Sequence, residues 1–310
     1  MQEVFSYGLT VATQVIILFI LIFAGYFMGK SRLVRKTGIT QLTDFLLYVI
    51  TPCLIVDAFI SVQFNPDTFG ELLISAGCAV LTHLIGVAFA FLFCKTKPLA
   101  KQAVYRYGII FSNGGFMSVP MVQALAGDYG VFLVSMYIIV INVITWTYGI
   151  TLYPSEKKTS KRKAIVNPGT IGIAIGLPLF FLPFAPPEII AKPLEYLSDL
   201  NTPVAMIITG YYLIGSNLRK GMRDVRMWLV AALRLLVIPL IMLVMFKYLF
   251  DLQDELLIAC MVPACAPCAV NNMMISAKFG GDTSLASRMI SFTTILSMLT
   301  MPLILMLTKL

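Results

Sequence analysis

Charged residues are scarce, at 12% of this 310-residue chain, whereas a typical soluble domain carries about 25%. Hydrophobic residues make up 59% of the sequence and the mean hydropathy is +0.89. A membrane-spanning helix needs about 20 mostly apolar residues, and apolar runs of that length fill the chain. The composition therefore predicts an integral membrane protein in the lipid bilayer and excludes a separate soluble catalytic domain.

Residues and motifs that carry catalysis are equally scarce. His83 is the only histidine, and the six cysteines lie in or beside apolar runs, where cysteine behaves as a small hydrophobe. We therefore predict no disulfide framework and no metal site. The sequence has no phosphate loop or hydrolase motif, which favours a protein that is not an enzyme. The net charge of +8 comes from short basic clusters between apolar runs, so it indicates membrane topology and no nucleic-acid partner.

Apolar windows between charged or turn-rich breaks predict an all-α protein with ten transmembrane helices. They lie near residues 7–29, 38–62, 69–94, 102–126, 130–153, 168–185, 199–217, 226–250, 255–278 and 283–308. Lysine and arginine gather in alternate connections, and the acidic residues in the others. By the positive-inside rule, this pattern predicts a multi-pass cell-membrane protein with both termini extracytoplasmic.

A charged segment without apolar periodicity, residues 154–167, divides the chain. We interpret it as a cytoplasmic linker between a first repeat of five helices, residues 1–153, and a second, residues 168–310. Because five is odd, equivalent helices of the two halves run in opposite directions, so the halves form an inverted repeat. Thr51-Pro52 and Thr202-Pro203 stand at equivalent places in the two halves.

Two of the expected helices, the fourth and the ninth, contain helix-breaking sequences. Ser112–Pro120 holds two adjacent glycines and a proline, and Val262–Asn272 holds two prolines. Unwound backbone is tolerated in a membrane where it is buried in protein or lines a wet cavity, and paired breaks in inverted halves point to a transporter's binding site. The alternative is that the prolines only kink two packed helices.

Each break creates a half-helix N-terminus that suits an anion and a half-helix C-terminus whose free carbonyls suit a cation. We predict that Asn113 and Asn271 converge from the two breaks on one midplane pocket. The predicted substrate-binding residues are those of the two breaks that offer polar groups or backbone freedom: Ser112, Asn113, Gly114, Gly115, Ser118, Pro120, Pro267, Asn271 and Asn272.

Polar residues inside the expected spans have alternative roles. Arg234 could bind a substrate carboxylate, but an ion pair with Asp44, at a comparable depth, is favoured over it, and snorkelling to the cytoplasm is a third reading. Asp57 is more often a solvated or capping residue than a proton carrier. His83 could couple transport to protons, although a hydrogen-bonded structural histidine is the commoner case. Asn142 suits structural bonding and ion coordination equally.

The run SNGGFMSVPMVQALAGDYG, from Ser112 to Gly130, resembles the fourth helix of the auxin efflux carrier family, and APCAVNNMMISAKFGG resembles its ninth. Ser118 departs from the family's frequent glycine, and Cys268 from its frequent proline. The resemblance implies a fold like that of sodium/bile-acid transporters, with broken helices four and nine crossing. In that fold helices 1, 2, 6 and 7 form a scaffold, helices 3–5 and 8–10 form a moving transport domain, and the scaffold makes a homodimer.

The resemblance also implies a secondary transporter or uniporter of a small organic anion, such as malate, malonate or an auxin-like acid, working by alternating access. A membrane-embedded ligand sensor that keeps this fold without flux is the alternative. No cofactor is expected. The coupling ion stays open between H⁺ and Na⁺: the breaks contain no Asp or Glu, which favours proton coupling or uniport, whereas carbonyls and asparagines can also bind sodium.

Overall fold

The computed structural model describes residues 2–62, 65–154, 168–182, 186–214, 221–252 and 254–309. Within these ranges the regular structure is helical, and one isolated antiparallel bridge joins Ser112 and Cys268. The predicted linker, residues 154–167, lies outside the described residues except for Pro154.

The helices of the first half follow the predicted order. They are α1 Gln2–Lys30, α2 Lys36–Phe45, η1 Leu46–Ile50, α3 Thr51–Ile60, α4 Pro66–Phe93, α5 Leu99–Ile110, η2 Gly114–Ser118, α6 Val119–Thr147 and η3 Gly149–Leu152. α6 is two helices joined at Gly127, whose φ of 60° and ψ of −157° are not helical. A positive φ costs glycine little because it has no Cβ, so the chain turns there between the predicted fourth and fifth helices.

The described residues of the second half also form a series of helices. Its helices are α8 Pro168–Phe181, α9 Glu188–Asp199, α10 Asn201–Tyr212, α12 Val225–Ala232, η4 Leu233–Val237, α13 Ile238–Leu243, η5 Val244–Leu249, α14 Asp254–Cys265, α15 Asn271–Phe279 and α16 Thr283–Leu307. α12, η4, α13 and η5 follow one another without a gap, and together they form one apolar helix over Val225–Leu249.

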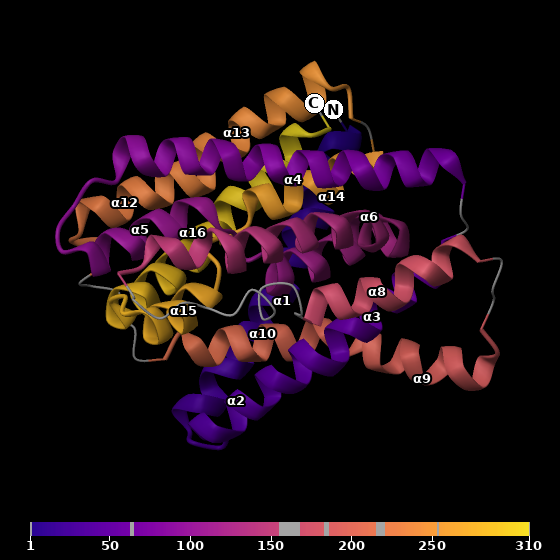
Figure 1. The fold of residues 1–310 in the computed structure, drawn as a ribbon, viewed down its shortest axis with the longest axis horizontal. Coiled ribbons are helices and arrows are strands. Elements are labelled where there is room, and N and C mark those ends of the chain that lie inside the picture. Colours follow the sequence, from indigo (N-terminus) through magenta and orange to yellow (C-terminus); the bar gives the residue numbers. More distant parts are fainter. Residues whose placement is uncertain are drawn as a thin grey trace.

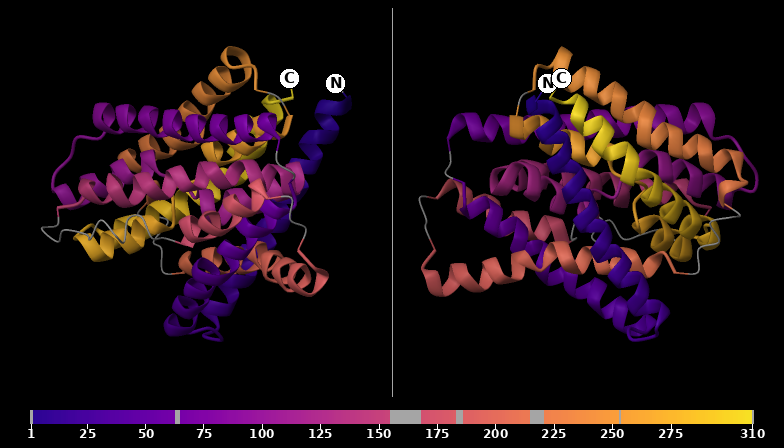
Figure 2. Two further views of the ribbon diagram at one scale, coloured as in Figure 1. Left: turned by 45° about the vertical axis from the view of Figure 1, so that its right-hand side comes forward. Right: turned by 180° about the vertical axis from the view of Figure 1, so that it is seen from behind.

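Two groups of helices pack against each other (Figures 1 and 2). In one group α1 lies along α10 and α3 packs on α8 and α9; in the other, α4 and α14 pack on α6, and α15 packs on α16. The groups meet where α10 contacts η2, α3 contacts α6 and α1 contacts α16. α1 begins and α16 ends at the same end of the molecule (Figures 1 and 2).

Helix ends are set by local chemistry. Asn65 begins α4 with a capping box, in which its side chain accepts from the Thr68 amide at 2.8 Å and the Thr68 hydroxyl accepts from the Asn65 amide at 3.2 Å. Asp282 caps α16 by accepting from the Leu285 amide at 2.9 Å. Each cap satisfies amides that would otherwise have no partner in the first turn.

Six helices of the described ranges are long and apolar enough to cross a membrane by themselves. They are Val11–Lys30, Lys36–Ile60, Pro66–Phe93, Gly114–Thr147, Val225–Leu249 and Thr283–Leu307. Of these, Gly114–Thr147 is the stretch that turns at Gly127. Other predicted spans consist of shorter pieces, because α5 and α14 stop at the breaks after 12 residues each. Breaks thus lower the number of long helices below the number of predicted spans.

One helix lies in a segment that the sequence places in a connection. α9 covers Glu188–Asp199, ahead of the helix predicted for residues 199–217. It carries exposed apolar side chains, among them Ile189 and Tyr196, beside Lys192 and Glu195, which form an ion pair at 3.7 Å. These charges and Pro193 interrupt the apolar run, and an amphipathic helix of this kind suits a membrane surface.

The crossing of α1 and α10 depends on glycine. A Cβ at Gly210 would overlap the carbonyl oxygen of Ile22, and a Cβ at Gly25 would overlap that of Ile207. Small residues let transmembrane helices approach closely enough for such backbone contact.

We therefore expect Gly210→Ala to lower the melting temperature of the purified protein, because the added methyl must push α1 and α10 apart. Gly77→Ala in α4 is the matched control: nothing lies within 4 Å of its Cβ position, and alanine is the better helix former by about 1 kcal/mol. Thermal unfolding in detergent measures both variants. Equal melting temperatures would show that the α1–α10 contact tolerates a side chain.

Candidate functional site

The two breaks lie against each other and are joined by backbone hydrogen bonds. The Asn113 amide donates to the Pro267 carbonyl at 2.7 Å, and the Ala269 amide donates to the Phe111 carbonyl at 3.1 Å. These are the bonds of a short antiparallel bridge centred on Ser112 and Cys268. The unwound backbone of one break therefore satisfies that of the other, which meets the requirement for non-helical backbone in a membrane.

Both breaks are shorter than the sequence predicts. Gly114–Ser118 forms the π-helical turn η2, and Pro120 lies in the first turn of α6, where a missing amide costs nothing. Pro263 lies inside α14, so the second break covers residues 266–270. Pro267 alone of these three prolines lies in unwound chain.

A cavity of about 70 Å³, here called the break cavity, opens beside the bridge. It is lined by Leu47, Thr51, Tyr107, Ser112, Asn113, Gly114, Gly115, Phe116, Ile138, Ile141, Asn142, Thr145, Ala269, Val270 and Asn271. No charged side chain is among these residues. The lining includes the first residues of η2, which continues into α6, and the first residue of α15. Two helix N-termini, the positive ends of their dipoles, therefore border one cavity.

Asn113 supplies a free donor at this place. Its side chain is 2% exposed, and its Nδ2 group has no hydrogen-bond partner within the described residues. A buried donor without a partner costs about 1–3 kcal/mol. Such a group is explained most simply by a ligand or a water that accepts from it.

The structure brings together five of the predicted substrate-binding residues in the lining, and Asn142 from the coupling candidates joins them. The five are Ser112, Asn113, Gly114, Gly115 and Asn271. Ser118, Pro120, Pro267 and Asn272 do not line it.

Asn272 has a structural role. Its Nδ2 donates to the Val104 carbonyl at 3.1 Å, and its Oδ1 accepts from the Tyr153 hydroxyl at 2.7 Å. One residue further along a helix is rotated by about 100°, since an α-helix has 3.6 residues per turn. Asn271 and Asn272 therefore serve different sides of α15.

Sequence reasoning missed Thr51, Tyr107 and Thr145 in the lining. Thr51 carried a signal, because Thr51-Pro52 matches Thr202-Pro203 between the two halves. Tyr107 and Thr145 lie in ordinary apolar helix, and no pattern distinguishes them from packing residues.

Arg234 lies in η4 and is 1% exposed. The predicted ion pair with Asp44 is not formed: Asp44 is exposed, and within the described residues the ion pair joins Lys192 and Glu195. The arginine instead donates to backbone carbonyls at the breaks. Equal depth along two helices does not put two side chains on facing sides, which is why the depth argument failed.

The remaining candidates lie apart from the break cavity. His83 is buried, and its Nδ1 lies 2.7 Å from the Ala79 carbonyl. Because a carbonyl only accepts, Nδ1 carries the proton. Its Nε2 has no partner in the described chain, and its ring lies near Phe111 and Tyr137. Asp57 lines a second, larger cavity.

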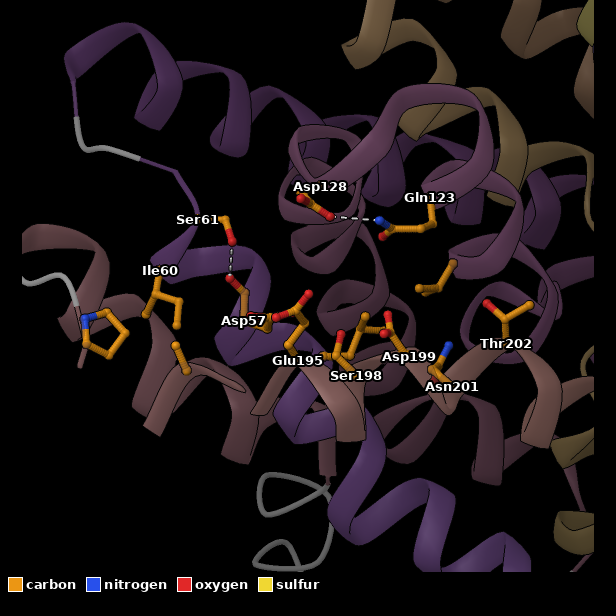
Figure 3. A pocket seen from close by; sticks show the side chains of 14 residues that line it. Asp57, Ile60, Ser61, Gln123, Asp128, Glu195, Ser198, Asp199, Asn201 and Thr202 are labelled. Carbon is orange, nitrogen blue, oxygen red and sulfur yellow. Dashed lines mark hydrogen bonds between the residues drawn. The ribbon is translucent and has the colours of Figure 1, made fainter. Parts of the chain in front are cut away.

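That second cavity, here called the acidic vestibule, has a volume of about 460 Å³. Figure 3 shows Asp57 from α3 and both Glu195 and Asp199 from α9, with Asp128 from α6 across from them. No lysine, arginine or histidine is among its lining residues. Val119 also lines it, one helical turn from Phe116 of the break cavity. Its potential is negative, so an anion that approaches along this route is repelled.

We therefore expect Asp128→Asn with Glu195→Gln to lower the KM for an anionic substrate presented on the vestibule side, by severalfold at low salt and less at high salt, because salt screens exposed charges. Asp44→Asn is the control, since Asp44 is exposed and outside both cavities. The measurement is initial uptake rate against substrate concentration at two ionic strengths. An unchanged KM at low salt would contradict the repulsion.

Comparisons with known proteins indicate a membrane transporter. The sequence model of a family described as "Membrane transport protein" matches residues 10–162 and 154–305. A protein of Methanothermobacter thermautotrophicus named "Uncharacterized transporter" is 23% identical over 291 residues, covering 92% of this chain and 94% of that protein. A protein of Rhizobium meliloti (strain 1021) named "Putative malonate transporter" is 22% identical over 294 residues, covering 90% of each.

Proposed function

Because this chain belongs to the membrane transport protein family, which includes the auxin efflux carriers and whose matches span most of its length, we propose that it carries a small organic anion across the membrane. Transport is secondary or uniport. The substrate site is the break cavity.

The observation that carries this proposal is the convergence of two helix N-termini on a cavity with an unpartnered donor. Each N-terminus is equivalent to about half a positive charge, so the pair supplies about one. Asn113 adds an Nδ2 group without a partner. Neutral side chains line the cavity, so an incoming carboxylate meets no competing charge of either sign. This arrangement suits one carboxylate group better than a cation.

The size of the site favours a short acid. A cavity needs about 10–15 Å³ of this kind of volume to hold a single water, so about 70 Å³ accommodates a group of a few heavy atoms. The relative named for malonate points to the same class. Malonate, a three-carbon dicarboxylate, is therefore the first substrate to test.

The architecture we propose is ten spans in two inverted repeats of five. α1, η1 with α2 and α3, α8, and α10 form the scaffold, and the other group of helices forms the moving transport domain. Thr51 lines the break cavity and its repeat equivalent Thr202 lines the acidic vestibule, as expected where an inverted repeat places related surfaces on opposite sides of a central site. Both termini outside the cell and a homodimer through the scaffold belong to this proposal.

A ligand screen tests the chemical class. Purified protein is heated with malonate, malate, other short acids, and organic cations of matched size. A ligand present at 100 times its Kd stabilises the folded state by about 2.7 kcal/mol, so a saturable rise in melting temperature with one or more acids is expected. Stabilisation by a cation and by none of the acids would overturn the proposal.

A further inference from the structure

Arg234 is a buried cation that binds backbone instead of carboxylate. Nε donates to the Ala266 carbonyl at 3.1 Å, Nη2 to the Pro263 carbonyl at 3.3 Å, and Nη1 to the Ile109 carbonyl at 3.4 Å. A fourth, short bond joins Nη2 to the Ala264 carbonyl. The side chain is 1% exposed, so water contributes little to its solvation.

The four carbonyls belong to the ends of the two half-helices. Ile109 is in the last turn of α5, Pro263 and Ala264 are in the last turn of α14, and Ala266 directly follows α14. The last carbonyls of a helix have no partner within that helix, and leaving them bare in a membrane is costly. A cation at this place satisfies both ends at once.

The charge of Arg234 is balanced by the two helix ends that it contacts. Each helix C-terminus is equivalent to about half a negative charge, so the two ends together offset the single charge of the guanidinium. Among the described residues, no charged side chain lines the break cavity at the N-terminal ends. Arg234 thus neutralises the negative side of the paired breaks and leaves the positive side for a ligand.

We infer that the guanidinium of Arg234 permanently fills the carbonyl site, the site formed by the backbone carbonyls at the ends of α5 and α14, where a coupling metal ion would otherwise bind. The protein therefore needs no Na⁺ or other metal cation. The chemistry of the site supports this: alkali cations take oxygen ligands such as backbone carbonyls, and here these oxygens are already bound by arginine. The statement about coupling rests on the proposed transport function, whereas the carbonyl site can be tested without a substrate.

The arginine also ties three segments together. It reaches from η4, in the long helix Val225–Leu249, to the ends of α5 and α14. α5 packs on α4, and η4 packs on α14 and α16, so these segments belong to the same group of helices and the paired breaks are held to the body of that group. A movement of the group relative to α1, α3 and α10 would therefore carry the paired breaks as one unit past Leu47 and Thr51, which line the break cavity from η1 and α3.

The test compares the full-length protein without substrate in sodium, potassium and choline chloride at equal ionic strength. Wild type is expected to have the same melting temperature in all three salts. Arg234→Ala is expected to be several degrees less stable in choline chloride, and to regain stability with sodium or with guanidinium below denaturing concentration, because either cation can enter the emptied carbonyl site. Urea at the same concentration controls for the denaturing action of guanidinium.

Arg226→Ala is the matched control, since Arg226 is exposed at the start of the same long helix; no cation-specific recovery is expected for it. Arg234→Ala that responds equally to all salts, guanidinium included, would overturn the carbonyl-site assignment. A gain of stability by wild type in sodium alone would also overturn the carbonyl-site assignment. This measurement on wild type tests the assignment even if Arg234→Ala does not fold.

Malonate affinity of wild type is then measured in sodium and in choline chloride. Equal affinities are expected, and affinity that requires sodium would contradict the inference. Absence of malonate binding in both salts would count against malonate as the substrate, while the substrate-free arms would still decide the role of Arg234.

Discussion

Asn113→Asp is expected to lower the affinity for malonate at pH 7 by about a hundredfold or more. The substitution keeps the shape of the side chain, replaces the unpartnered Nδ2 donor by an oxygen, and brings a negative charge to a buried site that has no charged neighbour in its lining. Like charges placed against each other across an interface cost several kcal/mol, and each 1.4 kcal/mol is a factor of ten in affinity. Isothermal titration of the purified variant measures the loss.

Two companion variants separate the loss of a donor from the gain of a charge. Asn113→Ala removes the donor alone, and a loss of about tenfold is expected for one hydrogen bond to a charged group. Ser118→Ala is the control, because Ser118 is buried on the same helical segment but does not line the cavity. Malonate affinity that is the same in wild type and Asn113→Asp would place the substrate elsewhere.

Malonate is expected to bind at least about tenfold more tightly than its diamide. The two compounds share their shape, and the diamide replaces both charged carboxylates by neutral groups, so that no carboxylate is left for the site. A hydrogen bond to a charged group contributes about 1.5–3 kcal/mol, against about 1 kcal/mol for a neutral one, and the two helix N-termini add their attraction for negative charge.

The same titration in wild type measures this contrast. Succinate and its diamide give a second pair, which tests whether the preference follows charge in an acid that is longer by one carbon. Equal affinity within both pairs would show that the helix ends at Gly114 and Asn271 do not face the ligand.

The sequence was sufficient to predict where the two breaks lie, although not how far each extends. Adjacent glycines at 114 and 115 and the proline at 267 disfavour continuous α-helix, so the approximate positions of the breaks are local information, although the two glycines lie in the π-helical turn η2. Asn113 directly precedes Gly114 and Asn271 follows Pro267 by four residues, and the structure places both in the lining of one cavity. A signal that depends only on neighbours in the chain can be recognised without a fold.

The partners of Arg234 could not be predicted in this way. Its acceptors lie 29 to 125 residues away in sequence and are main-chain carbonyls, which carry no residue-specific signal. The acidic vestibule was missed for a related reason. Asp128, Glu195 and Asp199 were interpreted only as marks of one membrane side, and the packing of α3, α6 and α9 decides that they share a cavity.

Uptake of labelled malonate into proteoliposomes tests the central claim most directly. Wild-type protein, reconstituted without sodium on either side, is predicted to carry malonate in a saturable manner, and Asn113→Asp in the same vesicles is predicted to carry almost none. Wild type that binds malonate but leaves the vesicles empty would contradict transport and identify a ligand sensor with this fold. Equal uptake by wild type and Asn113→Asp would contradict the assignment of the break cavity as the substrate site.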